Sequence, residues 1–102
     1  MNNITIYSAE AVSITVPVLV DVNPTGTPPQ FALSASDANV PGAFSVGAWL
    51  GTYASGKAKA ASPTVGGAGT LAILADNTYR LWCKVLVAGE TYCEPIATIL
   101  CP

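Results

Sequence analysis

The strongest constraint on the fold of this chain is an alternation of side chains in Asn77–Val87. The residues expected to face a core are Tyr79, Leu81, Cys83, Val85 and Val87. The residues between them are Arg80, Trp82, Lys84 and Leu86. A period of two is typical of a β-strand with one buried face. We therefore predict a central strand here, around which the other strands pack.

A tight turn precedes this strand. Leu74 is followed by an Asp-Asn turn, and Tyr79 opens the strand. This arrangement resembles the tyrosine corner of immunoglobulin-like β-sandwiches, in which the tyrosine hydroxyl hydrogen-bonds to the backbone a few residues upstream. The corner predicts a sandwich rather than a lone sheet.

Seven further segments show strand character between turn residues. They are residues 4–7, 12–22, 30–36, 44–54, 57–65, 70–74 and 95–100. Pro17 cannot donate to a ladder, so residues 12–22 are expected at a sheet edge or bend. Ser55-Gly56 predicts a hairpin turn, whereas a helix over residues 56–61 is a short alternative that Pro63 would stop. Which face of residues 44–54 is buried stays open.

These segments predict an all-β protein without internal repeats. The expected fold is a single immunoglobulin- or fibronectin-III-like β-sandwich of about seven to eight strands. A chain of 102 residues suits one such domain with one core, so residues 1–102 are taken as one domain.

The chain carries few charges. Only 10% of its residues are charged, against about 25% in a typical soluble domain. The exposed surface is therefore rich in small and apolar residues and favours contact with other proteins, although an alanine-rich composition from a GC-rich genome explains it equally well. Four basic residues and a net charge of −2 make nucleic acid an unexpected partner. No apolar run approaches the roughly 20 residues of a membrane helix, and no signal-peptide pattern is present, so no membrane partner is expected.

Three cysteines, Cys83, Cys93 and Cys101, are present. An odd number without a signal peptide favours free thiols in a reducing cell, and a Cys83–Cys93 or Cys93–Cys101 bridge is the alternative. The spacing does not match a zinc site, and the chain has no histidine. We expect neither a metal nor a cofactor.

The same lack of histidine argues against an enzyme, because the commonest general base is missing. Glu90 and Glu94 are the one carboxylate pair that glycoside chemistry could use, but two solvated loop charges explain them more simply. The glycine-rich residues 66–69 lack the Lys-Ser/Thr of a phosphate-binding loop and are read as a turn.

A contact surface is a better candidate than an active site. Arg80, Trp82 and Lys84 share one strand face, and Trp and Arg are enriched at interface hot spots. The alternative is that Trp82 faces the core toward the second sheet while the cationic side chains lie along the rim. Tyr53 and Tyr92 are further candidate contact residues.

A family resemblance covers about two thirds of the chain, from Phe44 onward. It is carried by residues 44–49 (FSVGAW), 62–67 (SPTVGG), 69–71 (GTL), 78–85 (TYRLWCKV) and 94–96 (EPI). Together these segments resemble small virion-associated proteins of tailed phages, particularly those that infect actinobacteria. The three cysteines depart from that pattern.

The resemblance implies a structural role in a phage particle. The expected protein is made in the host cytoplasm, resides in the virion, and binds the major capsid protein as a decoration or minor capsid protein. A component of the head–tail junction is the alternative within the same virion, and copies of the chain are further expected partners. A secreted or surface module that binds protein or carbohydrate is the alternative of another class.

Overall fold

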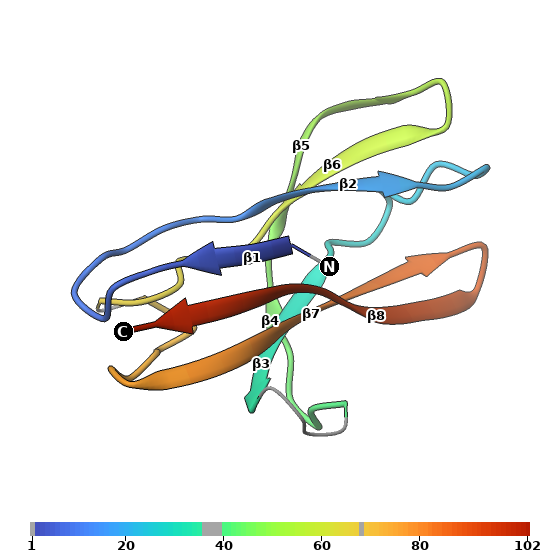
Figure 1. The fold of residues 1–102 in the computed structure, drawn as a ribbon. Coiled ribbons are helices and arrows are strands. Elements are labelled where there is room, and N and C mark those ends of the chain that lie inside the picture. Colours follow the sequence, from blue (N-terminus) through green and yellow to red (C-terminus); the bar gives the residue numbers. More distant parts are fainter. Residues whose placement is uncertain (1, 36–39, 68) are drawn as a thin grey trace.

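The computed structural model describes residues 2–35, 40–67 and 69–102, which form two packed β-sheets (Figure 1). One sheet has the strand order β1-β8-β7-β3-β4, and the other has the order β2-β6-β5. The strands are β1 (Asn2–Thr5), β2 (Thr15–Leu19), β3 (Gln30–Ala35), β4 (Ser45–Val46), β5 (Ala48–Ala54), β6 (Lys57–Ala61), β7 (Asn77–Val87) and β8 (Glu90–Cys101). The predicted all-β sandwich is confirmed, and the helical alternative at residues 56–61 is wrong because β6 lies there. Within these ranges no helix is long and apolar enough to cross a membrane.

The central strand β7 has the bounds that the alternation predicts, and it lies between β8 and β3. At its start the Leu74 backbone N–H donates to the Tyr79 hydroxyl at 2.9 Å, so the predicted corner is present. The order β8-β7-β3 opposite β2-β6-β5 corresponds to the G-F-C and B-E-D strands of immunoglobulin domains. The immunoglobulin or fibronectin-III type itself stays a prediction.

The predicted strand over residues 44–54 is in fact two strands in different sheets. β4 pairs with β3 in the large sheet, and β5 pairs with β6 in the small one. Gly47 is the crossing point: a Cβ there would collide with the Ala61 carbonyl oxygen and lie 2.6 Å from the Phe31 ring. On β5 the inward face is that of Trp49, which packs against the core, so the open question about this segment is settled.

Four other predicted strands differ in extent. Of residues 57–65, only β6 is a strand, and Val65 makes isolated bridges. Residues 70–74 form no strand; Leu71 makes a single bridge to Val65. The strand predicted over residues 12–22 shortens to β2, with a bridge from Val12 to Val65 before it. The first strand covers β1 rather than residues 4–7 and pairs in parallel with β8.

The end of the chain holds a hairpin that the sequence did not predict. β8 begins at Glu90, where a loop was expected, and pairs with β7 along its length. Ala88 and Gly89 form the turn with φ of 52° and 82°. Positive φ at both central residues is the requirement of a type I′ turn, whose twist matches the flanking strands. The Ser55-Gly56 turn, which was predicted, has the same character, with φ of 53° and 75°.

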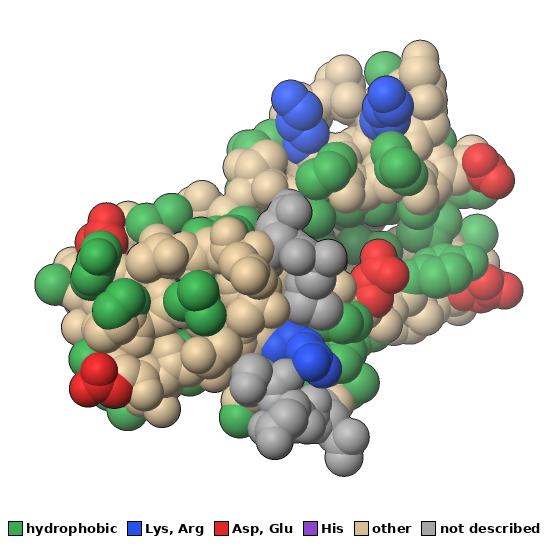
Figure 2. Space-filling model, in the orientation of Figure 1, with side chains coloured by type: hydrophobic (Ala, Val, Ile, Leu, Met, Phe, Trp, Pro, Cys, Tyr) green, Lys and Arg blue, Asp and Glu red, His purple; other side chains and the backbone are tan. Residues whose placement is uncertain are grey.

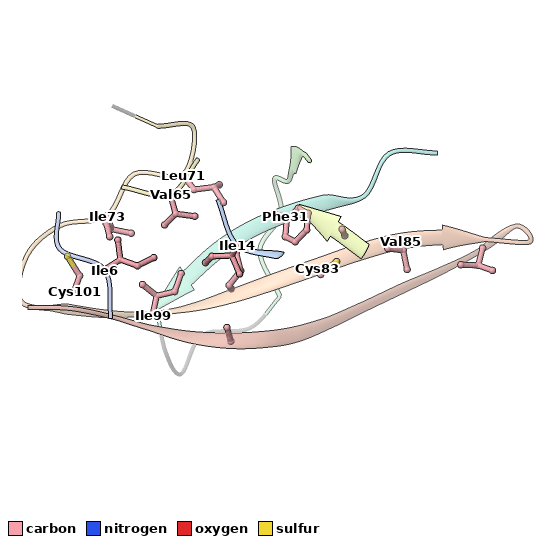
Figure 3. Close-up of a cluster of buried hydrophobic side chains, with 14 residues drawn as sticks. Ile6, Ile14, Phe31, Val65, Leu71, Ile73, Cys83, Val85, Ile99 and Cys101 are labelled. Carbon is pink, nitrogen blue, oxygen red and sulfur yellow. The ribbon is translucent and has the colours of Figure 1, made fainter. Parts of the chain in front are cut away.

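The core lies between the sheets and is densest at one end. The fully buried apolar side chains with the largest volume include Phe31, Ile6, Leu81, Ile99 and Val65. Figure 3 shows Ile6, Val65, Leu71 and Ile73 gathered over Ile99 and Cys101, while Val85 lies on the part of β7 that extends away from this cluster. We call the densely packed end the closed end and the opposite end, toward the β7–β8 turn, the open end.

Candidate functional site

The candidate site is a cleft of about 740 Å³ at the open end. One wall consists of residues 16–22, which belong to β2 and the segment that follows it. The other wall consists of the last residues of β7 and the first residues of β8. In Figure 1 the β5–β6 and β7–β8 hairpins diverge at this end, and Figure 2 shows the molecule hollowed between them. The volume is within the roughly 300–1,000 Å³ of ligand-binding pockets.

Valines make the two walls apolar. Val16, Val18 and Val20 alternate with exposed residues along β2, so their half-buried side chains share the inner face of the small sheet. From the large sheet, the buried side chains of Val85 and Val87 line the opposite wall. The alternation that builds the core at the closed end thus continues here, but the walls stand apart.

The rim of the cleft is acidic. Asp21, Glu90 and Glu94 are among the lining residues, whereas those residues include no Lys or Arg. The exposed Tyr92 hydroxyl donates to Glu90 Oε2 at 2.7 Å, and this hydrogen bond raises the pKa of Tyr92. The cleft is therefore an apolar slot with a negatively charged mouth.

Two unpaired strand edges flank the slot. β1 pairs only with Ala97–Leu100 of β8, so among the described residues nothing pairs with the outer edge of β8 from Glu90 to Ile96. β2 is the edge strand of the small sheet, as Pro17 predicted. The Val20 N–H donates to Gly56 and the Ile14 carbonyl accepts from Ser62, so even-numbered residues of this segment bond toward β6. Pro17 therefore faces the open edge, where it removes no ladder bond.

The thiols are free. Cys83 and Cys101 are buried and Cys93 is half-buried, and none forms a disulfide. Cys83 pairs with Glu94 and Cys93 with Lys84, so the first two cysteines project from opposite faces of the sheet. Burial, together with nearby Cys93 and Glu94, raises the pKa of the Cys83 thiol to about 12, and burial also raises that of Cys93. Neutral Cys83 serves as a small apolar side chain in the cleft wall.

The predicted contact residues of β7 lie on the outer face of the large sheet, away from the cleft. Trp82 is only 7% exposed, and its indole N–H donates to Ser34 Oγ at 2.8 Å. It packs between cross-strand neighbours Ala32 and Pro95, and not in the core between the sheets that the alternative assigned to it. The Arg80 guanidinium lies 5.9 Å from the Trp82 ring centre.

The remaining candidates lie elsewhere. Lys84 Nζ is 4.2 Å from the centre of the Phe44 ring, on the outer face of the large sheet. The Tyr53 hydroxyl donates to the Val20 carbonyl at 2.7 Å and so fixes the end of β2 that forms the cleft wall. Tyr92, 50% exposed, stands on the cleft rim. The structure thus brings Arg80, Trp82 and Lys84 together on one face but separates both tyrosines from them.

Glu90 and Glu94 do share a site, although not in a loop. Both lie on β8 with no bulge between them, so their Cα atoms are about 13 Å apart at the usual rise per residue. The interpretation of Glu90 and Glu94 as two solvated charges stays a prediction. Within the described ranges no group of three or more His, Cys, Asp or Glu could hold a metal ion.

The cleft itself was not predicted from the sequence. The available signal was a valine-rich alternating segment before Asn23 and a second one ending at Val87, each with carboxylates at its end. No protein-family model, curated protein or solved structure matches the chain.

Proposed function

We propose that this protein is a non-enzymatic structural protein of a tailed-phage particle, a decoration or minor capsid protein that binds the head shell and stabilises the particle. The observation that supports this proposal is the acidic-rimmed apolar cleft with an unpaired strand edge on each side. Such edges are templates for pairing with another chain, and an apolar slot beside them adds side-chain contacts.

The composition and the surface support a protein partner. Large apolar side chains are exposed on both sheets, among them Leu19 (71%) and Val46 (60%). The segments from Phe44 onward that resemble virion proteins point to a particle as the setting. A carbohydrate-binding role has less support, because Tyr92 is the one aromatic residue among those that line the cleft.

Quantitative peptide mass spectrometry on gradient-purified particles from the protein's source tests this proposal. A copy number near that of the major shell protein is the expected result for a decoration protein. A small, ring-like copy number would instead place the protein at the head–tail junction. Absence from particles would overturn the virion role and favour the binding module of another class.

Trp82 is unsuitable for mapping the interface in such particles. Its truncation would empty a buried position and break the bond to Ser34, so Trp82→Ala is expected to reduce folding stability as well as binding. Substitutions in the cleft and along its open edges leave the closed end intact and are the better probes.

A further inference from the structure

We propose that the cleft receives an extended segment of another protein chain, which adds to β8 as a strand and places basic side chains beside Glu90 and Glu94. This inference rests on the proposed function, a structural protein that binds other chains. It names the kind of segment bound and the edge to which that segment pairs.

The backbone of β8 offers the edge. In a hairpin with a two-residue turn, the flanking pair Val87 and Glu90 exchanges hydrogen bonds, and bonded pairs then alternate along the ladder. Residues 90, 92 and 94 therefore bond to β7, and Thr91 and Cys93 direct their N–H and C=O groups to the open side. Pro95 has no N–H, and β1 covers the edge from Ala97. The free edge thus accommodates a short added strand of about five residues.

The opposite rim is less suitable. Pro17 faces outward in the middle of the β2 edge, and a proline there interrupts any ladder that an added strand could form. The β2 side instead supplies an apolar wall, formed by Val16, Val18 and Val20. Side chains of the added segment would contact this wall.

The side chains of β8 define the sequence pattern of the segment. On the inner face, Glu90, Tyr92 and Glu94 follow one another at every second residue. Residues directly opposite on an added strand lie about 4.5–5.5 Å away, and pairs of opposite charge stabilise the sheet. The complementary segment is therefore basic-x-apolar-x-basic, with the apolar residue beside Tyr92 reaching into the slot.

A second folded copy of this chain is not the occupant. Within its sequence the pattern occurs as Arg80-x-Trp82-x-Lys84, in β7. β7 is paired on both sides by β3 and β8, so a folded copy cannot offer it. The acidic rim requires a basic segment, and the basic segment of this chain is already paired within its own sheet. The occupant is therefore a segment of a different chain.

The direct test uses two blocked seven-residue peptides, Thr-Lys-Thr-Val-Thr-Lys-Thr and Thr-Glu-Thr-Val-Thr-Glu-Thr. The full chain, labelled with ¹⁵N, is titrated with each while amide resonances are followed. The lysine peptide is expected to shift the Thr91 and Cys93 amides and to bind at least ten-fold more tightly than the glutamate peptide. Equal binding of the two peptides, or no shift at these amides at millimolar lysine peptide, would overturn the proposal.

Two proline variants identify the edge. Thr91→Pro removes an outward N–H of β8 and is expected to weaken binding of the lysine peptide at least ten-fold. Thr15→Pro, the matched control, removes an outward N–H of β2 and should leave binding unchanged. The reverse result would place the strand on β2 and overturn the assignment to β8. Circular dichroism and thermal unfolding establish that each variant is folded.

Filling the slot gives a test independent of the edge backbone. Val18→Trp places a large ring in the cleft from the β2 side and is expected to abolish binding of the lysine peptide while the fold persists. Glu90→Gln with Glu94→Gln should weaken that binding about ten-fold and strengthen binding of the glutamate peptide, because the like-charge repulsion is removed. Unchanged affinity in both variants would overturn the cleft as the site.

The outcomes separate this inference from the proposed function. If the parent protein and Thr91→Pro occupy particles in equal copy number, strand addition to β8 is wrong and the virion role stands. If the parent protein is absent from particles but binds the lysine peptide through β8, the virion role is wrong. The preference of the cleft for an extended basic segment then still stands. Sedimentation velocity that shows a dimer dispersed by Thr91→Pro would make a second copy the occupant and overturn the inference.

Discussion

The closed and open ends of this sandwich use the same kind of strand to different effect. At the closed end Ile6, Val65 and Ile99 are fully buried between the sheets. At the open end Val16 and Val18 face Val85 across a cleft of about 740 Å³. The core cluster continues along β7 to Val85 and Val87, but at this end the apolar side chains also line a cleft. Stability is expected to reside at the closed end, and binding at the open end.

The largest expected effect comes from truncating each end in turn. Ile99→Ala truncates a side chain with no exposed area at the closed end and is expected to lower the free energy of unfolding by about 2–5 kcal/mol. Val18→Ala, on the cleft wall, should cost about 1 kcal/mol, since its side chain is half-exposed and leaves no sealed cavity. Urea unfolding of both variants measures the difference. Similar losses would mean that the open end is packed as well as the closed end.

A smaller loss of stability is expected when the buried hydroxyl of Ser62 is removed. The buried Ser62 hydroxyl accepts from the Ile14 N–H at 2.8 Å and donates to the Pro63 carbonyl at 2.8 Å. Ser62→Ala leaves that buried N–H without its partner, at a cost of about 1–3 kcal/mol. Ser13→Ala is the matched control, because the exposed Ser13 donates only to the Ser62 carbonyl. Faster hydrogen exchange of the Ile14 amide in Ser62→Ala alone is the expected signature.

The smallest effect concerns Cys83, where the core meets the cleft. Its pKa is raised from 9.0 to about 12, chiefly by burial, so the unfolded chain loses this proton before the folded chain does. The stability contributed by the neutral thiol is complete below pH 9 and is lost between pH 9 and 12. At pH 10 the loss is at most about 1.4 kcal/mol.

Comparing the parent protein with Cys83→Val isolates this contribution, because valine keeps the apolar volume and has no proton to lose. Urea unfolding at pH 8 and pH 10 should show a decline in the parent that is smaller in the variant. An identical decline in both proteins would mean that water in the cleft reaches the Cys83 thiol and holds its pKa near 9.

Local patterns sufficed to predict some elements of this fold. The bounds of β7, the Tyr79 corner, the Ser55-Gly56 hairpin and the edge position of Pro17 each follow from a few neighbouring residues. The break at Gly47 does not, because its cause is the approach of the backbone to the Phe31 ring, far away in the sequence. Polar side chains also made residues 90–94 look like a loop, although they lie on an unpaired edge where a strand tolerates them.

The candidate site was harder to predict than the fold. Trp82 on an alternating strand was a reasonable contact residue, but its burial depends on cross-strand neighbours Ala32 and Pro95. The cleft requires two separate valine-rich segments to lie on opposite walls of a space between the sheets. Such a separation depends on how the sheets diverge, which no local pattern records.

The prolines at the two strand edges beside the cleft affect how many strands of other chains can add there. Pro17 interrupts one edge and Pro95 ends the other, so neither supports the long, regular ladder from which fibres grow. We therefore expect strand addition at the free edge of β8 to end after one short segment.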